Sequence, residues 1–130
     1  MIDVSDLNAV HRGRIAEHVV AQELRARNPL VNDKTVFWVR ERGTANAEVD
    51  FVVQHGGLLI PLEVKSGPVG RLRSLHAFID RAPHDYAVRL SAGEFSVERV
   101  KTVQGKEFKL MNLQYYVAGR IDQYLDWFVG

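Results

Sequence analysis

Apolar residues between Val4 and Arg27 recur at spacings of three and four, which is the period of an α-helix. Val20 and Leu24 lie on one face of this helix, and Glu17 shares that face because residues three and four apart are neighbours. Asn28-Pro29 is expected to end the helix, since proline restricts the residue before it to extended backbone. The pattern predicts one long helix that turns a carboxylate inward.

Further along the chain, short runs rich in β-branched and aromatic residues are typical of strands. We expect strands over residues 35–42, 47–54 and 58–65, a helix over 71–82, and a strand over 86–91. A second hairpin over 95–113 and an amphipathic helix over 113–129 are expected to follow. This order predicts an α/β fold, a mixed sheet flanked by helices, with a C-terminal hairpin and helix.

Gly56-Gly57 indicates a two-residue hairpin turn, because glycine supplies the positive φ angles that a type I′ turn needs. In that register residue 55 pairs with residue 58, and the apolar pairs fall on one side of the sheet. They are Val53 with Ile60, Phe51 with Leu62, and Val49 with Val64. The other side receives charged pairs, Asp50 with Glu63 and Glu48 with Lys65.

The two opposed carboxylates are the main chemical feature of the sequence. Side chains opposite each other on paired strands have Cβ atoms about 5 Å apart, so Asp50 and Glu63 would repel each other. A proton, a nearby cation or a bound metal would relieve this repulsion. Mg²⁺ and Mn²⁺ take carboxylate oxygens, and Glu17 is a candidate third ligand from the helix. With Lys65 on the same face, the arrangement predicts metal-assisted hydrolysis of a phosphodiester, in which Lys65 stabilises developing charge or orients the attacking water.

The simplest alternative is that Asp50 and Glu63 belong to the solvated face of an antiparallel sheet. Glu63 and its neighbours would then have no role beyond surface charge. The same face also carries apolar residues, Val52, Leu59 and Pro61. Their presence argues against a fully solvated face.

The blocks "EVDFVV" and "IPLEVKSG" resemble the PD-(D/E)XK nuclease superfamily, whose signature is an acidic residue on one strand and (D/E)-X-K on the next. Asp50 matches the first acid, Glu63 and Lys65 match the second motif, and Glu17 matches the acid often supplied by the first core helix. With "GRIAEHVVAQEL" and "SLHAFI", residues 13–91 resemble the DUF4143 family, the C-terminal domain of many bacterial and archaeal AAA-type ATPases. The resemblance implies a restriction-endonuclease-like αβββαβ core.

Two departures from the family pattern bear on function. Val49 stands before Asp50, where the superfamily's name gives a proline, and no G-x-x-x-x-G-K-[ST] phosphate-binding loop is present. The resemblance implies a Mg²⁺-dependent (or Mn²⁺-dependent) DNA endonuclease-like domain or, alternatively, a catalytically silent module that binds or regulates an AAA-type ATPase. In either case we expect one domain over residues 1–130, a fragment of or partner to an ATPase. Association into a homo-oligomer stays open.

Arg71 and Arg73 follow the loop after Lys65 and stand at the start of a predicted helix, where they would contact a DNA phosphate. Ser66 would add its backbone N–H group. The net charge is +1, so any binding of nucleic acid has to come from such local clusters.

The chain has 130 residues, of which 46% are hydrophobic and 25% charged, as expected for one globular domain. It has no cysteine, which excludes disulfides, thiolate zinc sites and cysteine nucleophiles. The absence of cysteine also fits a reducing compartment, and we predict that the protein is cytoplasmic. No apolar run approaches the ~18 residues of a membrane span, and the N-terminus lacks the apolar core of a signal peptide. We therefore expect no membrane association.

Overall fold

The computed structural model describes residues 4–26, 36–37, 49–65 and 73–130, and its elements follow the predicted order. They are α1 (Val4–Ala26), β1 (Val36–Phe37), β2 (Phe51–His55), β3 (Leu58–Val64), α2 (Arg73–Arg81), β4 (Tyr86–Ser91), β5 (Ser96–Lys101), β6 (Glu107–Gln114), the 3₁₀ helix η2 (Tyr115–Arg120) and α3 (Ile121–Val129). The predicted α/β class is confirmed.

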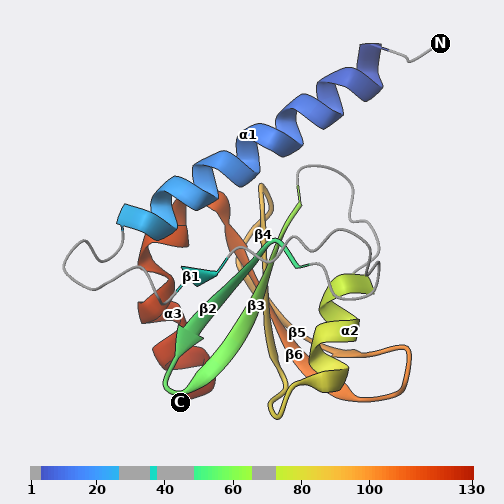
Figure 1. Ribbon diagram of the computed structural model, residues 1–130, viewed down its shortest axis with the longest axis vertical. Coiled ribbons are helices and arrows are strands. Elements are labelled where there is room, and N and C mark those ends of the chain that lie inside the picture. The colour runs from blue at the N-terminus through green and yellow to red at the C-terminus, as the bar shows by residue number, and fades with distance from the viewer. Residues whose placement is uncertain (1–3, 27–35, 38–48, 66–72) are drawn as a thin grey trace.

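Within the described residues the strands form one six-stranded sheet in the order β1-β2-β3-β4-β6-β5. β2 pairs antiparallel with both β1 and β3. β4 pairs parallel with both β3 and β6, and β5 pairs antiparallel with β6. Because β6 enters between β4 and β5, the C-terminal hairpin extends the central sheet. Helices cover both faces: α2 packs on one, and α1 and α3 pack on the other (Figure 1).

The β2–β3 turn has the conformation that its glycines predict. Gly56 and Gly57 have φ angles of 55° and 82°, in the left-handed region that side chains disfavour. The predicted register is confirmed from His55 opposite Leu58 to Phe51 opposite Leu62. The turn thereby fixes which side chains of this hairpin face each side of the sheet.

One predicted pair, Val49 with Val64, is wrong. β2 begins at Phe51, and Val49 packs in the apolar cluster on the α2 side of the sheet. The carboxylate of Asp50 accepts a hydrogen bond from the backbone N–H of Val64 at 2.8 Å. This N–H therefore bonds to a side-chain oxygen instead of a β2 carbonyl, and the strand alternation does not extend to Val49.

α1 covers one face of the sheet with an apolar stripe, as predicted. Ala16, Val20 and Leu24 are 7%, 0% and 2% exposed and pack with residues of the sheet and of the C-terminal helices. Gly119 in η2 lies against this helix, because a Cβ added to it would meet Oε2 of Glu23 at 2.7 Å. A side chain at this position would therefore displace the carboxylate end of Glu23, which is free to rotate, while the backbone of α1 stays at ordinary contact distance.

The C-terminal segment differs in part from the single helix expected over 113–129. β6 continues to Gln114, because Met111 and Leu113 alternate into the core, and the chain then passes through η2 before α3 begins. Ile121 and Leu125 bury one face of α3 completely. The amphipathic pattern that predicted a helix is therefore confirmed for α3.

α2 packs on the opposite face of the sheet through Leu75 and Ile79, which are fully buried. Lys106, in the turn between β5 and β6, donates hydrogen bonds from Nζ to the backbone carbonyls of Ile79, Ala82 and His84 at 2.7, 2.8 and 2.9 Å. Backbone carbonyls at the end of a helix lack partners within the helix. Lys106 therefore caps α2 and ties it to the β5–β6 hairpin.

Candidate functional site

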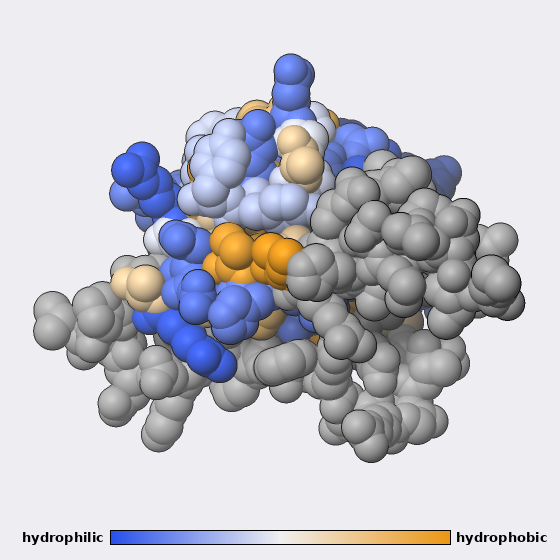
Figure 2. Space-filling view, turned by 90° about the horizontal axis from the view of Figure 1, so that it is seen from above, coloured by the Kyte–Doolittle hydropathy of each residue, from blue (hydrophilic) through white to orange (hydrophobic). Residues whose placement is uncertain are grey.

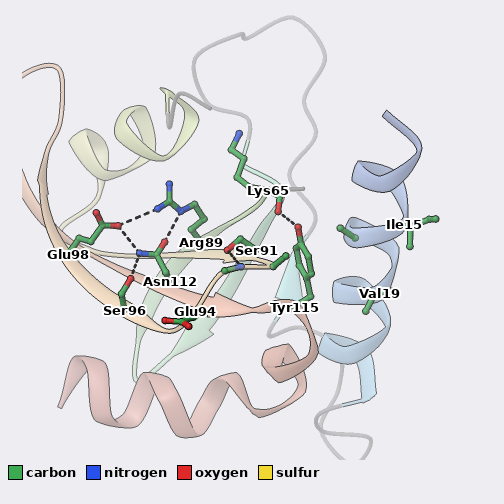
Figure 3. A pocket seen from close by; sticks show the side chains of 13 residues that line it. Ile15, Val19, Lys65, Arg89, Ser91, Glu94, Ser96, Glu98, Asn112 and Tyr115 are labelled. Carbon is green, nitrogen blue, oxygen red and sulfur yellow. Dashed lines mark hydrogen bonds and ion pairs between the residues drawn. The ribbon is translucent and has the colours of Figure 1, made fainter. Parts of the chain in front are cut away.

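The parallel strands β3, β4 and β6 end at the same edge of the sheet. Open α/β sheets bind ligands beyond the carboxyl ends of such strands. Figure 2 views the molecule from above, towards this edge, and shows a small apolar area among polar side chains. A cavity of about 790 Å³ lies there (Figure 3), and its lining includes Ile15, Val19, Lys65, Arg89, Asn112 and Tyr115.

Glu63 lies on β3 near this edge, and only 13% of its side chain is exposed. The Nζ atom of Lys65 is 3.2 Å from Oε1 of Glu63. The other oxygen, Oε2, is buried and has no hydrogen-bond partner among the residues that the structure describes. A buried polar atom without a partner costs folding free energy, so Oε2 of Glu63 is the atom of this site that needs an explanation.

Electrostatic effects connect Glu63 with the other predicted site residues. Burial raises the pKa of Glu63 from its ordinary value of 4.5 to about 7, and the charge of Asp50 adds to this rise. Lys65 acts in the opposite direction, and Glu17 on α1 raises the pKa by a smaller amount. The structure therefore brings Asp50, Glu63 and Lys65 together and places Glu17 close enough to act on the charge of Glu63.

A row of polar residues crosses the sheet from Glu63. Glu63 pairs in register with Arg89, Arg89 with Asn112, and Asn112 with Ser96. Arg89 donates from Nε to Oδ1 of Asn112 at 2.6 Å and from Nη2 to Oε2 of Glu98 at 3.3 Å. Asn112 in turn donates from Nδ2 to Glu98 at 2.7 Å and to Ser96 at 2.9 Å. This network fixes the guanidinium of Arg89 beside the site.

The sequence interpretation missed Arg89 and Asn112, although the signal was present. Arg89 lies between Val88 and Leu90 in β4, and Asn112 interrupts the apolar run of β6 in the same way. Both are buried, at 9% and 5% exposure. A polar residue inside an apolar strand has to find hydrogen-bond partners, so its presence indicates a polar cluster on one face of the sheet.

Comparison with known proteins identifies the family. The profile of a domain of unknown function, DUF4143, matches residues 12–116. The chain belongs to this family. No curated protein and no solved structure gives a significant match. The matched region of this DUF4143 domain contains Glu17, Asp50, Glu63, Lys65 and Arg89.

The donor atoms of the site in this DUF4143 domain fit a hard divalent cation. Mg²⁺ is usually held by one or two carboxylates and keeps several waters, and Mn²⁺ also prefers carboxylate oxygens. Glu63 offers a buried oxygen without a described partner, and Asp50 is the acid that acts most strongly on it. Across residues 4–26, 36–37, 49–65 and 73–130, no group of three or more His, Cys, Asp or Glu side chains is arranged to hold a metal. Of the two carboxylates, only Glu63 has a buried oxygen without a described partner, and Asp50 accepts the backbone N–H of Val64 through Oδ2.

The predicted DNA contacts of this DUF4143 domain are not tested by the structure. Ser66 and Arg71 lie outside the described residues, as does Glu48, the predicted partner of Lys65. Arg73 is described only as the first residue of α2.

No helix in the described part of the chain is long and apolar enough to cross a membrane.

Proposed function

We propose that this DUF4143 domain is a nuclease of the PD-(D/E)XK type, which hydrolyses phosphodiester bonds in DNA with Mg²⁺ or Mn²⁺. The main support is Oε2 of Glu63, which is buried without a described partner beside Asp50 and Lys65. A bound cation would give this oxygen a partner and relieve the repulsion between the two acids. Strongly perturbed carboxyl groups of this kind occur preferentially at functional sites.

Each residue of the site has a proposed role. Asp50 and Glu63 would hold the cation, with Glu17 approaching from α1. When bound, the cation would polarise the phosphate and lower the pKa of a bound water. Lys65 is positioned by Oε1 of Glu63 and by its own carbonyl, which accepts a hydrogen bond from the hydroxyl of Tyr115. Its ammonium group would stabilise the charge that develops on the phosphate oxygens, or orient the attacking water.

A plasmid-nicking assay tests this function. Supercoiled DNA and Mg²⁺ or Mn²⁺ are incubated with wild type, Lys65→Ala and the control Lys101→Ala. Lys101 is 69% exposed on β5, so its removal changes the net charge equally without touching the site. We expect Lys65→Ala to lower the cleavage rate by about 100-fold, the usual cost of removing one charge-stabilising donor, and Lys101→Ala to leave it unchanged. Equal cleavage by all three proteins, or none by any, would refute the proposal.

Exposed aromatic side chains support a second function, a catalytically silent module that binds an AAA-type ATPase. Phe95 and Trp127 are 49% and 64% exposed, and their ring centroids are 6.0 Å apart. Tyr124, on the same helix as Trp127, also packs against Phe95, with 5.9 Å between the ring centroids. Exposed apolar clusters mark protein interaction sites. Metal-dependent cleavage that Asp50→Asn abolishes would exclude a silent module.

A further inference from the structure

The guanidinium of Arg89 is fixed at the wall of the cavity beside the Glu63 site. The residue is 9% exposed, and Asn112 and Glu98 accept hydrogen bonds from Nε and Nη2. In Figure 3 the third nitrogen of this guanidinium has no dashed line to any of the residues drawn. Arg89 nevertheless lines the cavity. An arginine that is held by two neighbours and open to a cavity is preorganised to bind an anion such as phosphate.

The α1 side of the same cavity is apolar. Ile15, Ala16 and Val19 line it, and Tyr115 follows β6 at the strand ends (Figure 3). The hydroxyl of Tyr115 donates to the carbonyl of Lys65, which fixes its ring. A volume of about 790 Å³ lies in the range of small-molecule sites. One side of the cavity therefore suits a phosphate, and the other suits a sugar and a base.

We propose that this cavity takes one unpaired nucleotide next to the phosphate that is cleaved. Arg89 binds the phosphate of that nucleotide, and Ile15 and Tyr115 contact its sugar and base. The proposal rests on the nuclease function above, because Lys65 belongs both to the Glu63 site and to the cavity lining. A base inside a duplex has to be unstacked and unpaired before it enters, at a cost of a few kcal/mol. The preferred substrate is therefore single-stranded or frayed DNA.

The charges around the cavity predict how this binding depends on salt. Lys65 and Arg89 line the cavity, but so do Glu94 and Glu98. The cavity is thus not a broadly positive channel that attracts any polyanion. Affinity comes from hydrogen bonds with the fixed donor groups and from stacking of a base on the ring of Tyr115. Salt weakens these interactions less than it weakens the neutralisation of DNA phosphates by cationic side chains.

Binding of fluorescent oligonucleotides, followed by anisotropy in EDTA so that no cleavage occurs, tests the proposal. Wild type is expected to bind a single strand about tenfold or more tightly than the matching duplex, which reflects the cost of unpairing. Arg89→Gln is expected to lower the affinity for the single strand about tenfold, because a charge-assisted hydrogen bond to phosphate is lost. Arg99→Gln is the matched control, since Arg99 is exposed on β5 and carries the same charge.

A second pair of variants keeps the test valid if Arg89→Gln does not fold. Ile15→Asp places a carboxylate at the apolar side of the cavity, where Ile15 is already 49% exposed, so the change costs little stability. Val103→Asp makes the same change in charge at a position that is 87% exposed in the β5–β6 turn. We expect Ile15→Asp to weaken binding of the single strand about tenfold through repulsion, and Val103→Asp to leave binding unchanged.

The outcomes separate this inference from the nuclease proposal. Equal affinity for single strand and duplex, together with equal binding by Ile15→Asp and Val103→Asp, overturns the nucleotide site. Loss of binding on Ile15→Asp without any cleavage by wild type supports the nucleotide site and rejects the nuclease. Cleavage that depends on Lys65, with no effect of Ile15→Asp or Arg89→Gln on binding, rejects the nucleotide site and leaves the nuclease in place.

Discussion

Replacing Glu63 by glutamine is expected to stabilise the protein at and above neutral pH. Only 13% of the Glu63 side chain is exposed, and burial raises the pKa of this carboxyl from 4.5 to about 7, with a further contribution from Asp50. The wild type therefore holds an ionised carboxylate in an unfavourable environment at pH 8. Glutamine has nearly the same shape as the protonated acid and never ionises, so it avoids this cost.

The size and sign of the effect follow from the pKa. One pKa unit corresponds to 1.36 kcal/mol, so a rise from 4.5 to about 7 corresponds to about 3 kcal/mol of unfolding free energy. Because the folded protein binds the proton more tightly than the unfolded chain, this stability is fully present below pH 4.5. It is lost as the pH rises through about 7. Glu63→Gln should keep it at all pH values.

Urea unfolding, followed by circular dichroism between pH 4.5 and pH 8.5, measures this difference for wild type and Glu63→Gln. The control is Glu107→Gln, which removes an acid that is 67% exposed. We expect the unfolding free energies of wild type and Glu63→Gln to diverge by about 3 kcal/mol across this range, and those of wild type and Glu107→Gln to stay parallel. Parallel curves for all three proteins would show that Glu63 ionises at no cost, which refutes the reasoning. Mg²⁺ at pH 8 should stabilise the wild type and not Glu63→Gln, because a ligand stabilises only a state that binds it.

Two further predictions concern stability. Lys106→Met removes the hydrogen bonds to the carbonyls of Ile79, Ala82 and His84, and we expect it to lower the unfolding free energy by about 2–4 kcal/mol, measured by urea unfolding. A loss below about 1 kcal/mol would show that α2 does not depend on this cap. Gly57→Ala should cost about 1 kcal/mol, because Gly57 has a φ of 82° while its surroundings leave space for a Cβ. Gly57→Asn should cost less, since asparagine tolerates positive φ angles better than alanine. Equal urea midpoints for Gly57→Ala and Gly57→Asn would show that the loss of stability does not come from the backbone conformation.

Local patterns predicted the hairpin that carries the site. Two glycines fix its turn, and the predicted register then holds as far as Phe51 opposite Leu62. Asp50 and Lys65 lie just outside the paired strands, and the structure still brings them together with Glu63. The limit of this local reasoning is Val49, which lies beyond the point where the side chain of Asp50 takes over the hydrogen bond to β3.

The position of β6 was not predictable from such local patterns. A C-terminal hairpin is able to extend a sheet at either edge and with either strand, and only pairing between distant segments decides this. The structure places β6 beside β4, and this brings Asn112 next to Arg89. The hydrogen-bond partners of Arg89 could therefore be identified only once the order of the strands was known.

The contact between α1 and η2 has a consequence for how the protein is made. The apolar stripe of α1 packs with residues of η2 and α3, at the opposite end of the chain. During synthesis, α1 therefore has no complete partner until residues 115–129 have left the ribosome. Glu17 lies on α1, so its position relative to Glu63 depends on this contact. A chain that has been synthesised only as far as β6 therefore lacks the η2 and α3 residues that pack against α1, the helix that carries Glu17.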